Sequence, residues 1–332
     1  MLVYLFRRLI NVVLMLLVVA AVTFGIFFMV PKLTGTDPAL LYVGKIADHA
    51  AVEGIRHKMG LDKSIVEQFW LFLKGVFVGR DFNAGVDVTH CYAPCLGYSF
   101  KTEQEVFPLL LSRVGVDISL AVGASVLWLL LGTATGIVSA LRRGTALDRI
   151  SMTVALAGVS LPMYFTGLVA LAVFVHQLGW FPNTYTEFAD DPVSWFQGLV
   201  LPWITLAFLF AATYARLSRA TLLDVLGEDY IRTARAKGLK EPVVIGKHAM
   251  RSTLTPILTV FGMDLGGLLG GAVLTEKTFN LRGLGYEAVQ SISSSDLPVI
   301  MGVTMFAAFF IIMASLVVDL LYAVVDPKVK LA

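Results

Sequence analysis

Long apolar stretches alternate with polar segments along this chain of 332 residues. The apolar stretches cover about residues 9–30, 115–140, 150–178, 197–217, 254–275 and 299–325. A helix needs roughly 20 apolar residues to cross the hydrocarbon core of a bilayer, which is about 30 Å thick. The pattern therefore predicts an all-α polytopic membrane protein with six transmembrane helices.

The composition excludes an ordinary soluble domain. Hydrophobic residues make up 57% of the chain and charged residues 15%, whereas soluble domains carry about a quarter charged residues. The first apolar stretch follows Arg7 and Arg8, as a signal peptide would. At about 22 residues it is longer than the apolar core of a signal peptide, so we expect a retained anchor.

The distribution of Lys and Arg predicts the orientation of the chain, because short cytoplasmic loops are enriched in these residues. The short loop 179–196 contains neither Lys nor Arg, whereas the segment between the fourth and fifth stretches is strongly basic. The loop 31–113 carries nine basic residues, but it is longer than the loops to which the rule applies. We therefore expect both termini in the cytoplasm.

These assignments divide the chain. An N-terminal membrane helix occupies 1–30, an extracytoplasmic loop or cap 31–113, a five-helix core 114–325 and a cytoplasmic tail 326–332. The core includes a cytoplasmic loop at 218–253. Apolar residues recur at helical spacing from Ser64 to Phe77, which favours a folded cap on the membrane surface over a bland spacer.

Two cysteines, Cys91 and Cys95, lie in the expected extracytoplasmic loop. They are too few for a disulfide framework or a metal cluster built from two CxxC pairs. An oxidising compartment would allow them to close one small disulfide ring that shapes the loop. Two free thiols are the alternative.

The chain lacks the motifs of an independent enzyme. There is no GxxxxGK[ST] phosphate loop, since Gly246-Lys247 is followed by His248, and there is no HExxH or GxSxG. The five histidines form no cluster with metal-ligand spacing. We expect no catalytic residue, no metal site and no cofactor in this chain.

Apart from Arg216 at the inner end of the fourth stretch, four ionisable residues fall within the expected spans: Asp117, His176, Asp264 and Asp319. Three of them lie near span ends, and only Asp264 lies near a span centre. A carboxylate at that depth normally faces the bundle interior or a water-filled path. Glycines at 262, 266 and 270 surround it with a small-xxx-small pattern that permits close helix packing.

The inner segment 218–253 has the local chemistry of a short helix. Acidic residues come first and basic residues last, which complements a helix dipole, and Gly238 is a plausible residue to end the helix. Tyr230, Ile231, Ala234 and Leu239 can form a modest apolar face, and a second helix can follow over 242–253. A basic loop lying on anionic lipid is the alternative.

The run Asp229-Tyr230-Ile231-Arg232-Thr233-Ala234-Arg235-Ala236-Lys237-Gly238-Leu239 resembles the loop of ATP-binding-cassette importer permeases of the dipeptide, oligopeptide and nickel type. The resemblance continues through 267–273, Gly283-Leu284-Gly285 and Asp326-Pro327, and upstream through Ser160-Leu161-Pro162. Arg232-Thr233-Ala234 replaces the general Glu-Ala-Ala, and the segment from Cys91 to Cys95 looks like an addition.

The resemblance implies a permease subunit in the inner membrane of a prokaryote. Its partners would be a second homologous permease, two cytosolic ATPase subunits that bind ATP and Mg, and an extracytoplasmic substrate-binding protein. The residues implied in coupling to the ATPase are Asp229, Tyr230, Arg232, Ala234, Arg235, Lys237 and Gly238. The expected substrates are di- or oligopeptides, with nickel chelates or glutathione-like compounds as alternatives, and no nucleic acid is expected.

The resemblance leaves two interpretations of Asp264. The carboxylate lines the path and meets the amino terminus of a passing peptide, or it holds a neighbouring permease helix by a hydrogen bond. A secondary transporter remains the rival class of protein. It would be expected to show an internal repeat and several ionisable groups at mid-membrane depth, and neither pattern is apparent in this sequence.

Overall fold

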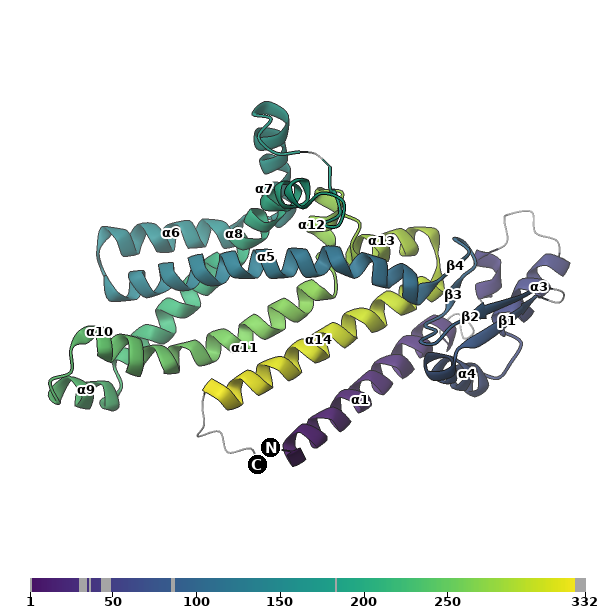
Figure 1. The fold of residues 1–332 in the computed structure, drawn as a ribbon, viewed down its shortest axis with the longest axis horizontal. Helices are drawn as coiled ribbons and strands as arrows, with labels where there is room; N and C mark the ends of the chain where they lie inside the picture. Colours follow the sequence, from purple (N-terminus) through teal and green to yellow (C-terminus); the bar gives the residue numbers. More distant parts are fainter. Residues whose placement is uncertain are drawn as a thin grey trace. The chain divides into compact units, whose positions relative to one another are not determined.

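The structure is a computed structural model that describes residues 2–29, 35, 37–42, 49–84, 87–182 and 184–325 (Figure 1). The side chain of Asp319 and the predicted tail 326–332 lie outside the described residues. The chain divides into two compact units. The first contains Val116–Leu281 and Met313–Ala332, and the second contains Leu2–Gly115 and Arg282–Ile312.

Five helical segments in the described part of the chain are long and apolar enough to cross a membrane. They are Phe6–Met29, Val106–Leu141, Pro192–Leu226, Glu241–Leu269 and Leu297–Val318. A sixth span results if two bent segments, Ala146–Ser160 and Met163–Gln177, count as one. The predicted fold class, an all-α polytopic membrane protein, is confirmed.

The third predicted span, over 150–178, is sharply bent. Helix α6 (Ala146–Ser160) ends before Leu161, and α7 (Met163–Ala170) continues into a π-helical segment, η3 (Leu171–Gln177), at an angle of 99° to α6. Leu161 has an extended backbone, with φ −86° and ψ 130°. The proline that follows it explains the break, since a residue before proline is driven out of the helical region.

Two other spans have different ends from those predicted. Helix α5 (Val106–Leu141) begins earlier, so Asp117 lies several turns inside it and is fully buried rather than near a span end. Helix α11 (Met250–Leu269) stops well before 275. The chain turns there at Gly271, which has φ of 120°, and continues as α12 (Val273–Thr278).

The first unit is held together by close packing of α5, α11 and α8 (Pro192–Leu226). Trp128 and Tyr214 are fully buried at its centre. The indole Nε1 of Trp203 on α8 donates to the carbonyl oxygen of Ser119 on α5 at 2.8 Å. In a membrane, where lipid is as apolar as a side chain, van der Waals packing and such hydrogen bonds hold helices together.

Glycines bring the backbones of α5 and α8 together. A Cβ atom at Gly132 would lie 2.7 Å from the carbonyl oxygen of Ala211, and one at Gly136 would lie 2.4 Å from that of Ala215. No side chain fits at such distances, so the helices can approach only with glycine at both positions. This GxxxG pair was missed in the sequence, although its spacing is a recognised packing signal.

The second unit holds a folded cap at the end of α1 (Leu2–Phe24), which extends into the π-helical segment η1 (Gly25–Met29). The other elements of the cap are η2 (Pro38–Leu41), α3 (His49–Met59), α4 (Ile65–Val78), β1 (Arg80–Ala84), β2 (Asp87–Cys91), β3 (Tyr98–Ser99) and β4 (Gln104–Glu105). The amphipathic helix predicted from Ser64 is present as α4, and the Ser64 hydroxyl accepts a hydrogen bond from the backbone N–H of Glu67.

The strands form two antiparallel hairpins, β1–β2 and β3–β4, with Phe82 opposite Thr89 and Ser99 opposite Gln104. The second unit also contains α13 (Leu284–Ser294) and the first part of α14 (Leu297–Val325), which extends into the first unit. The Ser99 hydroxyl donates to the buried carboxylate of Asp296 between α13 and α14. The backbone N–H of Leu297 donates to the Tyr42 hydroxyl at 2.9 Å, so the cap is fastened at this turn.

Candidate coupling surface and membrane core site

Helix α9 (Asp229–Ala236) follows the end of α8, as the sequence predicted. Its last turn closes with hydrogen bonds from the backbone N–H of Gly238 to the Arg235 carbonyl at 2.9 Å and from that of Leu239 to the Ala234 carbonyl at 3.4 Å. Gly238 has φ of 75°. This left-handed conformation is accessible to glycine without a steric penalty, which explains the residue at the helix end.

One side of α9 is packed into the first unit. Ile231 and Ala234 are buried in a cluster with residues of three other elements. These are Ala140 of α5, Leu222 of α8, and Val244 and Ala249 of the π-helical segment η4 (Val244–Ala249). Helix α9 therefore packs directly against two long helices of the first unit.

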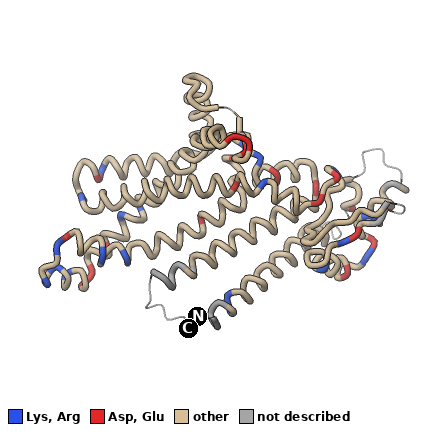
Figure 2. The backbone as a smooth tube through the Cα atoms, viewed as in Figure 1, with Lys and Arg blue, Asp and Glu red and all other residues tan. Residues whose placement is uncertain are grey.

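Charged residues are concentrated along α9 and the turns next to it (Figure 2). The side chains of Asp229 and Arg232 are 95% and 71% exposed, and they pair with each other at 3.3 Å. Lys237 is also exposed. Of the four residues expected to form an apolar face, Tyr230 and Leu239 remain exposed, so only Ile231 and Ala234 anchor the helix.

Arg235 belongs to an ion pair within the loop. Its Nε donates to Oε1 of Glu241 at 2.6 Å, and its Nη2 donates to Oε2 at 3.4 Å. Glu241 begins α10 (Glu241–Val243), which continues through η4 into α11. The predicted second helix over 242–253 is therefore not separate, because it runs on into the fifth span.

A partly buried ion pair that the sequence did not reveal joins α6 to α8. Nε and Nη2 of Arg219 donate to Oδ1 and Oδ2 of Asp148 at 2.8 and 2.9 Å. The Ser139 hydroxyl and the Gly144 backbone N–H also donate to this carboxylate. The sequence Thr145-Ala-Leu-Asp148 is a helix-capping pattern and could have marked Asp148 as structural, but nothing local marks its partner 71 residues away.

Asp264 has a partner within this chain. The hydroxyl of the buried Tyr214 on α8 donates to its Oδ2 at 2.9 Å. Asp264 is partly exposed and lies in the last two turns of α11, not at the centre of a span. Because one oxygen is held by Tyr214 and the side chain is only partly covered, the carboxylate can still meet a further group.

The glycines around Asp264 do not share one role. A Cβ at Gly262 would lie 1.9 Å from Cγ2 of Val318, so α11 and α14 touch at this position. A Cβ at Gly267 would have no described atom within 4 Å. Helix packing inside the chain therefore accounts for Gly262, whereas Gly267 faces open space.

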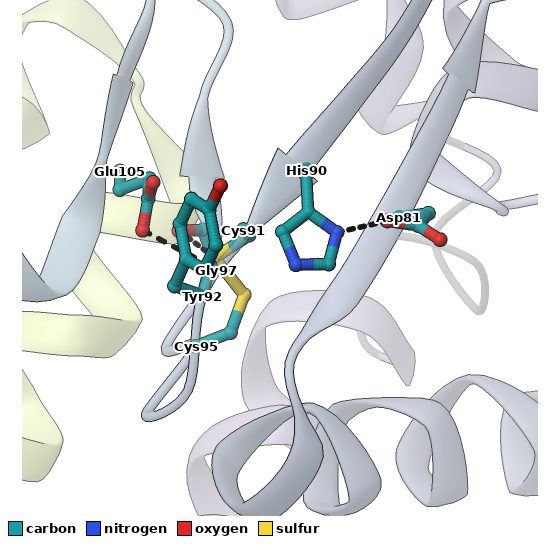
Figure 3. Close-up of a disulfide and its surroundings, with 7 residues drawn as sticks. All are labelled: Asp81, His90, Cys91, Tyr92, Cys95, Gly97 and Glu105. Carbon is teal, nitrogen blue, oxygen red and sulfur yellow. Dashed lines mark hydrogen bonds and ion pairs between the residues drawn. A yellow bond between two sulfur atoms is a disulfide. The ribbon is translucent and has the colours of Figure 1, made fainter.

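Cys91 and Cys95 are joined by a disulfide in the cap (Figure 3). Both residues are buried, and the backbone N–H of Cys95 donates to the Gly75 carbonyl of α4 at 3.2 Å. Figure 3 shows the His90 ring turned toward the Asp81 carboxylate, with which it forms a hydrogen bond. The closed ring thus packs on the C-terminal end of α4 and continues the β1–β2 hairpin.

The structure thus combines a bundle of membrane helices with a folded, charged helix between the fourth and fifth spans, an arrangement that suits a transport permease. The family profile described as "Binding-protein-dependent transport system inner membrane component" matches residues 132–331. The profile for the N-terminal part of the same membrane component matches residues 1–121. The chain belongs to this family and is the inner-membrane permease of an ATP-binding-cassette importer, which confirms the resemblance seen in the sequence.

Curated relatives match over nearly the whole length. The glutathione transport system permease protein GsiC of Escherichia coli strain K12 is 37% identical over 330 residues, or 99% of both chains. The GsiC proteins of Escherichia coli O6:H1 and Pectobacterium atrosepticum are 36% and 37% identical, in each case over 330 residues and 99% of both chains.

A solved structure shares the fold. A chain of the methionine transporter MetNI, in inward-facing conformations, aligns with a TM-score of 0.52 at 15% identity. The alignment covers 66% of the present chain and 97% of that chain. At this identity the likeness concerns the fold alone.

Proposed function

We propose that this permease imports small peptides, including glutathione-like tripeptides, in an ATP-driven complex. The observation that carries the proposal is the match to glutathione permeases over 99% of both chains at 36–37% identity. Glutathione is itself a tripeptide, so this substrate falls within the peptide class expected from the sequence. A nickel chelate is the alternative substrate.

The same proposal assigns α9 to the contact with an ATPase subunit. Its charged outer side would dock on the ATPase, while Ile231 and Ala234 pass the movement to α5 and α8. ATP and Mg would be bound by two ATPase subunits and not by this chain. A second, homologous permease would complete the path, and a substrate-binding protein would deliver the peptide.

Uptake of labelled substrate tests the proposal. A strain that lacks the permease should regain uptake of glutathione or small peptides when this chain and its partner subunits are supplied. Uptake should stop when the Walker lysine of the ATPase subunit is replaced. Uptake that continues without ATP hydrolysis would indicate a secondary transporter, and uptake of a nickel chelate but no peptide would change the substrate class.

We expect both termini in the cytoplasm, with Asp190 outside and Lys240 inside. Both positions are exposed in the structure, and the acidic loop around Asp190 contrasts with the basic loop around Lys240. Asp190→Cys should react with a membrane-impermeant maleimide in intact cells, and Lys240→Cys only after permeabilisation. The native cysteines are bonded to each other and give no background. Labelling of both variants from one side would contradict this topology.

Asp264 is proposed to line the path. Asp264→Asn should leave assembly intact but lower uptake several-fold or change substrate preference, because it removes a charge and keeps a hydrogen-bond acceptor for Tyr214. Tyr214→Phe is the matched control, since it removes the hydrogen bond and keeps the carboxylate. If both variants lose assembly to the same extent, the pair is structural. If Asp264→Asn transports a range of peptides normally, the charge has no role in the path.

A further inference from the structure

Helix α4 packs one of its faces against two membrane helices of the second unit. Phe72 is buried in a cluster with Ala20 and Phe24 of α1 and Met301 of α14. The rings of Phe24 and Phe69 lie 5.3 Å apart, centre to centre. The predicted amphipathic face of α4 thus finds its partner within the chain.

This packing fixes the depth of α4 relative to the membrane. The apolar segment Phe6–Met29 has 24 residues. At about 1.5 Å per residue it is roughly 36 Å long, slightly more than a hydrocarbon core of about 30 Å. Its last turns, which carry Phe24, therefore lie near the boundary between hydrocarbon and headgroups. Helix α4 lies beside them and thus at the same level.

A second apolar surface on α4 is uncovered. Val66, Trp70 and Phe77 are 79%, 66% and 79% exposed. At about 100° per residue these three side chains fall within about 40° of one another around the helix axis. Val22 and Ile26, which belong to the neighbouring span, are also exposed. Surface aromatics clustered in this way mark an interaction surface.

Basic residues border this surface. Lys63 lies just before α4 and Lys74 lies on it. Both line an open cavity of about 410 Å³ together with Lys58 and Arg80. Asp81 is the acidic residue in the lining of this cavity. Glu67 pairs with Lys63 at 3.2 Å, so four cations stand against two carboxylates. This excess of positive charge favours an anion, and one with a phosphate group fits the boundary region of a membrane.

We propose that α4 is an interfacial helix whose Trp70 and Phe77 enter the leaflet at the C-terminal end of α1, and that the adjoining cavity binds the phosphate of an anionic phospholipid. The arrangement has the three features of a helix lying in a membrane surface. It has an apolar face with Trp and Phe, lysines at the border, and a depth set by neighbouring spans. The cap would then be anchored to lipid as well as to α1.

Spin labels test the position of the helix. Nitroxides attached to Trp70→Cys and Phe77→Cys in the assembled importer, in lipid nanodiscs, should be reached by oxygen severalfold more than by a water-soluble nickel complex. Glu53→Cys on α3, which has an exposed side chain, is the control and should show the reverse. The bonded native cysteines take no label. Val66→Cys replaces either variant if it fails to assemble.

Two outcomes would contradict the proposed position of α4 in the membrane surface. If the nickel complex reached the labels at positions 70 and 77 as well as it reaches the label at position 53, α4 would face water. Low access of both reagents would mean that a protein partner covers it.

The amount of phospholipid that stays bound to the purified importer tests whether the cavity is a lipid site. Importer taken from nanodiscs with equal phosphatidylglycerol and phosphatidylcholine should retain phosphatidylglycerol in native mass spectra. Retention should fall about fivefold for each lysine lost in Lys63→Gln and Lys74→Gln, and should persist in Lys63→Arg and Lys74→Arg. Unchanged retention in the Gln variants would overturn the lipid site. Displacement of the lipid by inorganic phosphate would mean that the cavity takes free anions instead.

Discussion

Gly136→Ala should prevent the permease from assembling. A single methyl group at this position would lie 2.4 Å from the backbone oxygen of Ala215 and 2.7 Å from Cβ of Ser218. Neither neighbour can rotate away, because one is backbone and the other is attached directly to it. The helices must separate, and overpacking of this kind costs about 1–3 kcal/mol or more. The yield of monodisperse importer after detergent extraction, and its melting temperature, measure the effect.

Gly115→Ala in the same helix is the matched control. A Cβ there would have no described atom within 4 Å. Alanine favours a helix over glycine by roughly 0.5–1 kcal/mol, so this variant should be as stable as the unsubstituted chain or slightly more so. If Gly136→Ala assembles as well as Gly115→Ala, the close approach of α5 and α8 does not hold the unit together.

Features that depend on a local run of residues could be predicted from the sequence. Apolar length predicted the spans, because crossing a bilayer is a requirement on length alone. Helix α9 was predicted because its acidic start, basic end and terminal glycine are all local signals. Helix α4 was predicted for a similar reason, since the helical spacing of its apolar residues is a local pattern.

Features that depend on distant partners could not be predicted. Asp148 and Arg219 lie 71 residues apart, and Tyr214 and Asp264 lie 50 apart. The hairpin β1–β2 contains Asp81, Thr89 and His90, whose polar side chains hide the alternation that marks a strand. The bend at Leu161 was missed for a different reason. Its signal, Pro162, was visible, but the surrounding apolar run was long enough to suggest one uninterrupted span.

Gly238→Val should uncouple ATP hydrolysis from transport if α9 meets the ATPase as proposed. At φ of 75°, a residue with a side chain costs about 1–2 kcal/mol, which lowers the population of the native loop about five- to thirtyfold. Because valine is branched at Cβ, we expect its cost to lie at the upper end of this range. Gly238→Asn is the matched control, because asparagine tolerates this conformation. The measurement is ATP hydrolysis stimulated by loaded binding protein, with assembly checked by co-purification.

Charge changes separate the docking surface from the internal ion pair. Arg232→Glu reverses a charge on a side chain that is 71% exposed, so it should weaken ATPase binding at low salt, with less effect at high salt because surface charges are screened.

Arg235→Glu instead places a negative charge next to Glu241, the partner of Arg235 at 2.6 Å. The double variant Arg235→Glu with Glu241→Arg restores the pair and should recover coupling, which Arg235→Glu alone loses in part. Failure of the exchange to recover coupling would assign Arg235 to the ATPase contact. Wild-type coupling in both Gly238→Val and Arg232→Glu would show that α9 does not transmit the movement of the ATPase.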